Sequence, residues 1–206
     1  IPSFITPMAA VAGSIADNIL KVLIDDTHLE KAYVNNGGDI SFYLNENQTM
    51  KGSLAAIPNM IAEIKYKDKS RGIATSGWRG KSFSRGIADS VTVLANNAAM
   101  ADAAATMICN AVDIYDHPNI KKKPANEIYE ESDLNNLLIT VEVGELTKVE
   151  IKQALKNGYH TAMKYVQEDL INTALIQISD FFCIVQKNST DLNIINKSKL
   201  EKITYN

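Results

Sequence analysis

Asp102 and Thr106 are two oxygen-bearing side chains whose spacing could bind a metal ion. They lie four residues apart in an alanine-rich segment, and a helix over 98–112 would place them on one face. A carboxylate and a hydroxyl suit Mg²⁺, which completes its octahedron with substrate phosphate and water. A satisfied polar pair near the helix start, where Asp also suits the dipole, would have the same spacing. On these residues alone both interpretations stay open.

A second candidate site is the stretch Asn36-Gly37-Gly38-Asp39. β-prone apolar residues precede and follow it, so residues 32–44 predict a strand, a turn and a second strand. Asn-Gly and Gly-Gly accept positive φ without steric cost, which favours a hairpin turn. The same glycines could leave backbone N–H groups bare beside the Asp39 carboxylate, close to a ligand. A plain hairpin and a ligand-binding turn are therefore both consistent with this stretch.

A third candidate follows a short apolar strand, where Thr75, Ser76 and Gly77 bring hydroxyl groups and flexibility. Such a segment suits hydrogen bonds to a polar ligand. Trp78 is the only tryptophan and stands beside Arg79. This pair could stack on a flat ring or cap the core, and the residues do not decide between the two.

Two small-residue helices are expected to pack close to these sites. Thr6 is a candidate N-cap and Pro7 suits the first turn of a helix over 8–24. Its first half is almost entirely small residues, as is much of the helix over 98–112. Small side chains let a helix lie close to a sheet, a second helix or a ligand. Gly13 costs about 1 kcal/mol relative to Ala inside a helix, so a packing or ligand role is expected there.

The remaining elements follow from apolar patterning. Strands are expected over 86–95, 137–143 and 181–185, and Thr147 is expected to cap a long helix. Residues 53–66 fit either a helical turn after Pro58 or a strand beginning near Glu63. Residues 113–133, including Lys121–Lys123, are expected to form an exposed connection that ends in a short acidic helix.

The composition narrows the class of protein. The chain has 206 residues, 46% hydrophobic and 22% charged, with a net charge of −3. This is globular, and no basic excess calls for nucleic acid. Cys109 and Cys183 lie in apolar runs, which favours buried thiols in a reducing, cytoplasmic setting. The three histidines are too scattered to form a zinc motif. The sequence has no uninterrupted run of about 18 apolar residues, so no membrane span is predicted. The opening Ile1 suggests that a segment is missing upstream.

Taken in order, the segments resemble the ApbE-like superfamily, and most of all its shorter, uncharacterised branch of FAD:protein FMN transferase relatives. Four blocks carry the resemblance: 4–13 (FITPMAAVAG), 34–40 (VNNGGDI), 74–78 (ATSGW) and 88–106 (ADSVTVLA running into ADAAAT). It covers roughly residues 1–187. The implied fold is α+β, with mixed or antiparallel sheets and alanine-rich helices packed close to a central cavity. The expected domain is 1–187, followed by a polar, disordered tail over 188–206.

The resemblance also implies roles for the candidate residues. The Gly-Gly-Asp turn lies at the FAD site of the transferases, which assigns ligand binding to Asn36, Gly37, Gly38 and Asp39. Thr75, Ser76 and Gly77 would line the same site. Asp102 and Thr106 would bind Mg²⁺, and a backbone carbonyl near Val11 or Ala12 would complete the metal site.

The chain departs from the transferases at two blocks. Ala12-Gly13 stands where they usually carry Lys-Gly, and 85–90 (RGIADS) replaces their His-x-x-Asp-Pro block, so the histidine is absent and only Asp89 aligns. Two hypotheses follow. The first is a Mg²⁺-dependent enzyme that transfers FMN from FAD to a protein hydroxyl, with Asp89 as the catalytic residue. The second is a ligand-binding protein of the same fold, or an enzyme acting on another nucleotide-like substrate. A small-molecule ligand, an acceptor protein and a homodimer are the partners expected.

Overall fold

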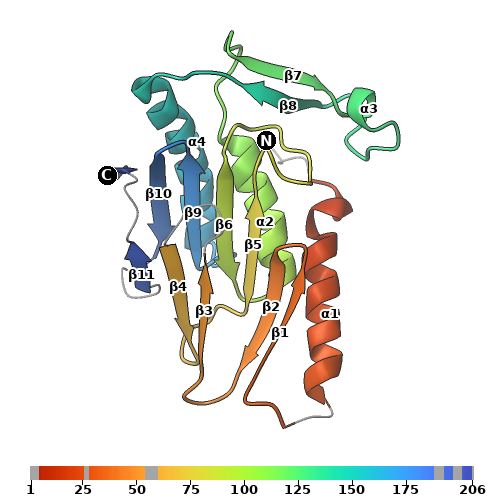
Figure 1. Cartoon of the computed structure of the whole chain (residues 1–206), viewed down its shortest axis with the longest axis vertical. Coiled ribbons are helices and arrows are strands. Elements are labelled where there is room, and N and C mark those ends of the chain that lie inside the picture. The colour runs from red at the N-terminus through yellow and green to blue at the C-terminus, as the bar shows by residue number, and fades with distance from the viewer. Residues whose placement is uncertain (1–4, 26–27, 54–59, 188–192, 197–200, 206) are drawn as a thin grey trace.

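The computed structural model describes residues 5–25, 28–53, 60–187, 193–196 and 201–205 of an α+β protein with mostly antiparallel sheets (Figure 1). Its helices are η1 (Pro7–Ala10), α1 (Val11–Asp25), α2 (Ala98–Ala111), α3 (Ala125–Ile128) and α4 (Lys148–Gln167). Its strands are β1 (Lys31–Asn36), β2 (Asp39–Leu44), β3 (Thr49–Ser53), β4 (Met60–Lys65), β5 (Gly72–Ser76), β6 (Ser90–Ala95), β7 (Ile120–Pro124), β8 (Leu138–Val143), β9 (Thr173–Ile178), β10 (Phe181–Gln186), β11 (Asn193–Asn196) and β12 (Glu201–Lys202).

The main sheet has the strand order β1-β2-β5-β6-β9-β10-β12, and its pairs are antiparallel except β10 with β12. Its central strands β6 and β9 are buried at every position, because both faces of the sheet are covered. Helices α2 and α4 pack on one face over a core that includes Val93, Ile108 and Leu155. A second apolar cluster, which includes Phe42, Ile64 and Phe182, joins the main sheet to β4 of the three-stranded sheet β11-β4-β3.

Glycines set how closely α2 approaches its neighbours. A Cβ on Gly72 of β5 would lie 2.2 Å from the Ala98 backbone nitrogen, and one on Gly13 of α1 would lie 2.4 Å from the Ala98 carbonyl oxygen. Neither position has room for a side chain, since ordinary contacts are longer than about 3.5 Å. The expectation that the small-residue helices pack closely is thus confirmed, and Gly13 has a packing reason.

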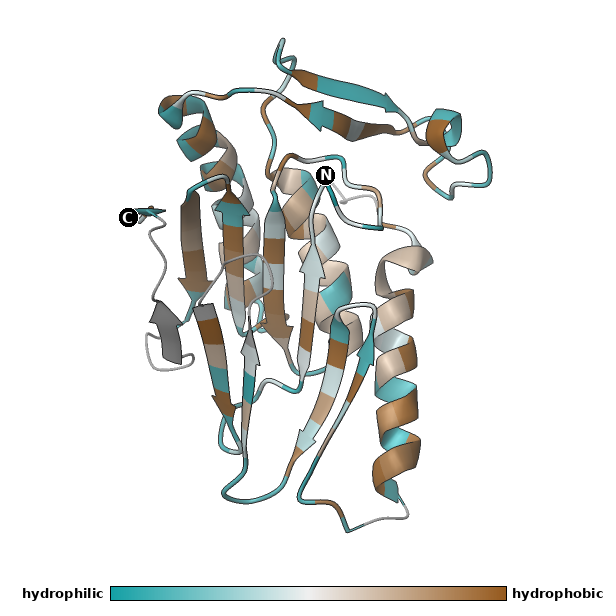
Figure 2. Ribbon diagram, viewed as in Figure 1, coloured by the Kyte–Doolittle hydropathy of each residue, from teal (hydrophilic) through white to brown (hydrophobic). Residues whose placement is uncertain are grey.

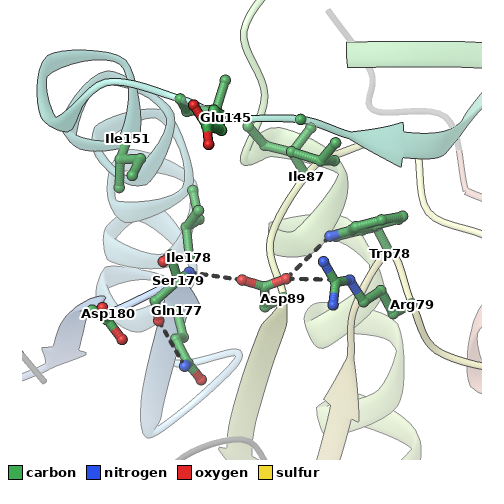
Figure 3. Close-up of a pocket in the computed structure, with 13 residues that line it drawn as sticks. Trp78, Arg79, Ile87, Asp89, Glu145, Ile151, Gln177, Ile178, Ser179 and Asp180 are labelled. Atoms are coloured by element: carbon green, nitrogen blue, oxygen red, sulfur yellow. Dashed lines mark hydrogen bonds and ion pairs between the residues drawn. The ribbon is translucent and has the colours of Figure 1, made fainter. Parts of the chain in front are cut away.

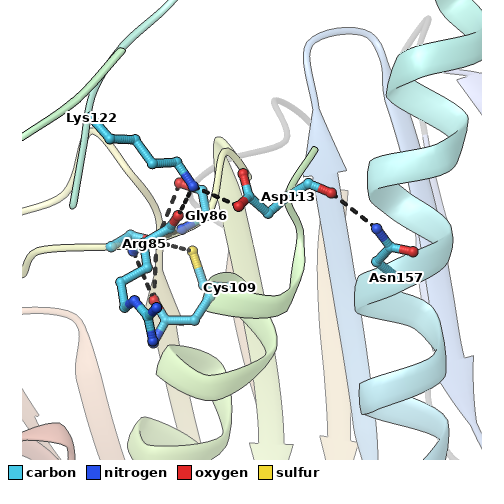
Figure 4. A network of polar contacts seen from close by, with 8 residues as sticks. Arg85, Gly86, Cys109, Asp113, Lys122 and Asn157 are labelled. Carbon is cyan, nitrogen blue, oxygen red and sulfur yellow. Dashed lines mark hydrogen bonds and ion pairs between the residues drawn. The ribbon is translucent and has the colours of Figure 1, made fainter. Parts of the chain in front are cut away.

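The connection after α2 was predicted to be exposed and to end in a short acidic helix; the helix is α3, with Glu127 in its first turn, but a strand before it was not predicted. Residues 120–124 form β7, which pairs with β8 in a two-stranded ribbon above the main sheet (Figure 1). Lys121 pairs with Glu142 across the ribbon, whereas Lys122 turns inward. The Lys122 ammonium donates to the Arg85 carbonyl at 2.6 Å and to the Asp113 carboxylate (Figure 4). Alternation along a strand therefore separates neighbouring lysines that composition alone treats as equally solvated.

Local signals locate most of the other elements. Thr147 and Glu150 form the capping box of α4, with the Thr147 hydroxyl accepting from the Glu150 N–H at 3.3 Å. Pro7 occupies the first turn of η1, but the Thr6 hydroxyl donates to Asp133 and makes no capping bond. The strand expected from Glu63 is β4, and Pro58 lies outside the described residues.

Two features at the C-terminal end depart from the predictions. Thr173–Ile178, for which no strand was predicted, is the buried strand β9. Within the tail predicted to be disordered, β11 pairs with β4, β12 pairs with β10, and Ile203 is buried in the core. These parts of the tail belong to the fold.

One helical segment, Pro7–Asp25, is long and apolar enough to cross a membrane by length and composition among the described residues. Here it packs against β1, β2 and α2.

Candidate functional site

The predicted site residues of the main sheet lie at one end of its strands. Asp39 begins β2, Ser76 ends β5, Ser90 begins β6 and Ile178 ends β9, all at this end of the strands, and by register Asp39 lies level with Ala74, two residues in from Ser76. We call this end of the strands, which runs across the sheet from β2 to β9, the Asp39 edge. The β7–β8 ribbon lies above it (Figure 1). Residues that are far apart in sequence are thereby brought side by side.

At one end of the Asp39 edge is the turn between β1 and β2. Asn36 and Asp39 pair directly, and Gly37 and Gly38 adopt φ values of 71° and 119°. A two-residue turn with positive φ at both positions suits the right-handed twist of the flanking strands. The Asn35 side chain accepts from the Gly38 N–H at 2.9 Å. The predicted hairpin is confirmed, and a Cβ on either glycine would meet nothing within 4 Å, so the tip is open.

Asp39 and Asp102 form an acidic pair between β2, α1 and α2. The Asp102 carboxylate accepts from the Gly13 N–H at 3.0 Å, and the Asn36 amide donates to the Ala12 carbonyl at 3.1 Å. The Thr75 backbone N–H reaches the Asp39 carboxylate. Burial, followed by the nearby charge of Asp102, raises the pKa of Asp39 to about 6, and burial also raises the pKa of Asp102. Neither carboxylate has a salt bridge among the described residues.

The acidic pair lies beside other protein groups that were predicted to bind a metal or a nucleotide. Asp102, Asp39, Asn36 and the Ala12 carbonyl converge, although Asp39 was assigned to nucleotide binding and not to metal. Thr106 follows Asp102 by one helical turn and is half-buried, on the same face. The described residues contain no cluster of three or more His, Cys, Asp or Glu side chains that could hold a metal. Carboxylate, hydroxyl and carbonyl oxygens are nevertheless donors that fit Mg²⁺.

Asp17, which sequence reasoning missed, holds α1 and α2 in place below the acidic pair. Its carboxylate accepts from the backbone N–H groups of Ala98 and Ala99 at 3.0 and 2.9 Å, and from the Ser41 hydroxyl at 2.6 Å. An anion at a helix N-terminus satisfies free N–H groups and suits the helix dipole. Asp17 and Ala98 are 81 positions apart in the sequence, which explains why no local signal indicated this contact.

Thr75, Ser76 and Gly77 each approach a different part of the protein. The Thr75 hydroxyl lies 2.9 Å from the Thr92 hydroxyl. Ser76 lies near the buried Cys109 thiol, which the Ser84 hydroxyl approaches to 3.1 Å, and burial raises the pKa of this thiol to about 11. A Cβ on Gly77 would lie 2.3 Å from the Asp89 carbonyl oxygen, so the close approach of these two segments requires glycine. Ligand binding by these three residues stays a prediction.

Further along the Asp39 edge, Asp89 lies in a cavity of about 700 Å³. Its lining includes Trp78, Arg79, Asp89, Glu145, Gln177 and Asp180. The Asp89 carboxylate accepts from the Ser179 N–H at 2.7 Å and the Trp78 indole N–H at 3.2 Å, and the Arg79 guanidinium lies 3.9 Å away (Figure 3). Arg79 also stacks over the Trp78 ring at 4.7 Å from its centroid. The volume falls in the range of small-molecule sites.

Comparisons of the sequence with known proteins place the chain in a family. The model of a family described as AbpE bacteria matches residues 1–190. A UPF0280 protein of Methanococcoides burtonii is 40% identical over 114 residues, covering 53% of this chain and 47% of that protein. UPF0280 proteins of Methanococcus maripaludis strain C6 and Methanocaldococcus jannaschii are 42% and 38% identical over 111 and 112 residues, covering 50% and 51% of this chain and 44% of each relative. The matches span a little under half the length of these relatives.

Proposed function

Because the chain belongs to the AbpE bacteria family, which is related to ApbE, we propose that it binds a flavin nucleotide together with Mg²⁺ along the Asp39 edge. The observation that carries the proposal is the acidic pair, Asp39 and Asp102. Burial and the neighbouring Asp102 charge both raise the pKa of Asp39, and among the described residues neither carboxylate has a salt bridge, so the pair favours a bound cation.

The surrounding donors support Mg²⁺ in particular. Asp39, Asp102, Thr106 and the Ala12 carbonyl would hold the ion, which prefers a small number of protein oxygens and keeps positions for phosphate and water. Bound there, Mg²⁺ would neutralise charge on the oxygens of a diphosphate. The hydrogen bond from Gly13 fixes one Asp102 oxygen and orients the carboxylate.

The cavity at Asp89 supports the flavin-binding part of the proposal. It lies on the same edge as the acidic pair, with Thr75–Gly77 between them in the strand order. A dinucleotide is an elongated ligand with its charge near the middle, so a metal site and a separate ring pocket suit its two parts. In this arrangement Trp78 and Arg79 offer flat surfaces for an aromatic ring.

FMN transfer is the second candidate, and it depends on Asp89. A general base must accept a proton from the attacking hydroxyl. Asp89 borders the cavity and is part-exposed, but three protein donors already contact its carboxylate. These contacts favour a role in positioning the 177–180 turn and the Trp78 ring, and so favour binding over transfer.

The binding proposal is tested by adding FAD to the protein with and without Mg²⁺, while flavin fluorescence and melting temperature are measured. We expect quenching and a higher melting temperature that both require Mg²⁺. No response in either condition would rule the proposal out. AMP release together with FMN bound covalently to a Thr-containing acceptor would establish transfer, AMP release with free FMN would indicate hydrolysis, and binding without AMP release would leave a binding protein.

Two variants locate the metal. Asp102→Ala is expected to remove the Mg²⁺ dependence, and Asp116→Asn is the matched control. Asp116 is exposed and has φ of 51°, a conformation that Asn also accepts, so this change removes a carboxylate away from the site without strain. An unchanged Mg²⁺ response in Asp102→Ala would contradict the assigned metal site.

A further inference from the structure

Helix α1 carries apolar residues on two opposite faces. Gly13, Ala16 and Leu20 are buried against the body of the protein. On the opposite face an outer stripe is exposed, and Figure 2 shows brown, hydrophobic residues along this helix at the side of the molecule. The outer stripe consists of Met8 of η1 and Val11, Ile15, Ile19 and Val22 of α1, with exposed fractions from 37% to 71%. A contiguous exposed apolar surface beside polar residues marks an interaction site, so this stripe calls for a partner.

The average spacing of the outer stripe is that of a helix-pairing seam, although a strict seam alternates steps of three and four and would have Asn18 in place of Ile19. Successive members are separated by three, four, four and three residues, an average of 3.5. The same steps read identically from either end, with Ile15 at the centre. An antiparallel copy of α1 would therefore set Ile15 against its own equivalent, Met8 against Val22, and Val11 against Ile19. A surface that matches itself in this way is what a two-fold interface requires.

We propose that the outer stripe is the interface of a symmetric dimer in which α1 pairs antiparallel with α1 of a second copy of this chain. The size of the stripe fits this occupant. Its five side chains expose roughly 450 Å² of apolar surface, close to the apolar share of a standard contact of about 800 Å² per partner.

A membrane surface fits the outer stripe less well. Interfacial helices that bind anionic lipid carry Lys and Arg beside their apolar face. Among the described residues of η1 and α1, Lys21 is the only basic side chain, and the chain as a whole has a net charge of −3. The other charged positions of α1 are Asp17 and Asp25, and Asp17 is turned inward to α2. This charge pattern favours a protein partner.

The pairing would also support the acidic pair. The Ala12 carbonyl and the Gly13 N–H, which hold Asn36 and the Asp102 carboxylate, belong to the same helix as the outer stripe. A partner helix packed on the open side limits movement of α1 away from α2. The dimer itself does not depend on flavin or Mg²⁺ binding.

The mass in solution tests the proposal. By sedimentation equilibrium at tens of micromolar, the wild-type protein is expected to have the mass of two chains, and Ile15→Glu that of one chain with an unchanged circular dichroism spectrum. Val149→Glu is the matched control, because Val149 of α4 is 77% exposed and lies outside the stripe. A one-chain mass for the wild type, or a two-chain mass for Ile15→Glu, would overturn the proposal.

Cross-linking tests the antiparallel arrangement without depending on whether Ile15→Glu folds. Under oxidising conditions Ile15→Cys is expected to form a disulfide-linked dimer, and the pair of variants Met8→Cys and Val22→Cys is expected to cross-link when mixed. Val22→Cys alone should not, since the native Cys109 and Cys183 are buried. Rapid cross-linking of Val22→Cys alone would contradict the antiparallel pairing. Wild-type binding to phosphatidylserine vesicles that Ile15→Glu abolishes would instead assign the stripe to a membrane.

Discussion

Replacing Gly13 by alanine sets helix propensity against packing. Propensity alone would stabilise α1 by about 1 kcal/mol. The new Cβ, however, would lie 2.4 Å from the Ala98 carbonyl oxygen and 2.7 Å from the Ala99 nitrogen, and both are backbone atoms. The two helices would have to separate by about 1 Å to restore ordinary contact. Overpacking of this kind costs about 1–3 kcal/mol.

The same separation would stretch the hydrogen bond from the Gly13 N–H to the Asp102 carboxylate, an interaction with a charged acceptor worth about 1.5–3 kcal/mol when intact. Since only part of that bond would be lost, the balance is a net destabilisation of about 2 kcal/mol. For a domain of this size, this lowers the melting temperature by about 4–8 °C.

Urea unfolding followed by circular dichroism measures the change. Gly52→Ala in β3 is the control, because a Cβ there meets nothing within 4 Å, and only the propensity gain of about 0.5–1 kcal/mol is expected. If Gly13→Ala were more stable than the wild type by about 1 kcal/mol, as propensity alone requires, the close packing of α1 on α2 would be refuted.

Three further predictions concern single side chains. Asp39→Asn should raise the melting temperature without Mg²⁺, because it removes one of two facing carboxylates, and should reduce the shift that Mg²⁺ produces; thermal unfolding with and without the ion measures both effects. Thr147→Ala should lower stability by about 1 kcal/mol in urea unfolding through loss of the α4 cap, and an unaltered midpoint would contradict the capping role. A hydrogen bond from His117, followed by those from Thr147, lowers the pKa of Glu150 from 4.5 to about 2. Because the folded state holds this proton less tightly, the stabilisation is present above pH 4.5 and is lost as the pH falls towards 2, and unfolding curves of Glu150→Gln should lack this component.

The sequence predicted features whose causes are local. The β1–β2 turn follows from two glycines that accept positive φ, and the start of α4 follows from Thr147 and Glu150. Strand β9 was missed because its six residues are enclosed on both faces, so they show no alternation of polar and apolar side chains. Lys121–Lys123 suggested solvent exposure, whereas pairing with β8 turns Lys122 inward.

The candidate site was predictable in residue type but not in arrangement. Asp102 and Asp39 were both identified as functional, yet only the fold brings the two carboxylates together, since they are 63 positions apart. Asp17 gave no signal because its partners are the backbone groups of a distant helix, and backbone groups leave no mark in a sequence.

The pairing of β6 with β9 has a consequence for how this protein is made. Ser90 lies opposite Gln177, so the centre of the main sheet closes only after the chain has been synthesised for a further 87 positions beyond Ser90. Until then the β9-facing edge of β6 presents free N–H and C=O groups, as any unpaired strand does. Contacts between residues so distant in sequence also slow folding. Strand β9 therefore completes a part of the core whose other strands were synthesised well before it, and the nascent chain depends on protection of that edge until β9 arrives.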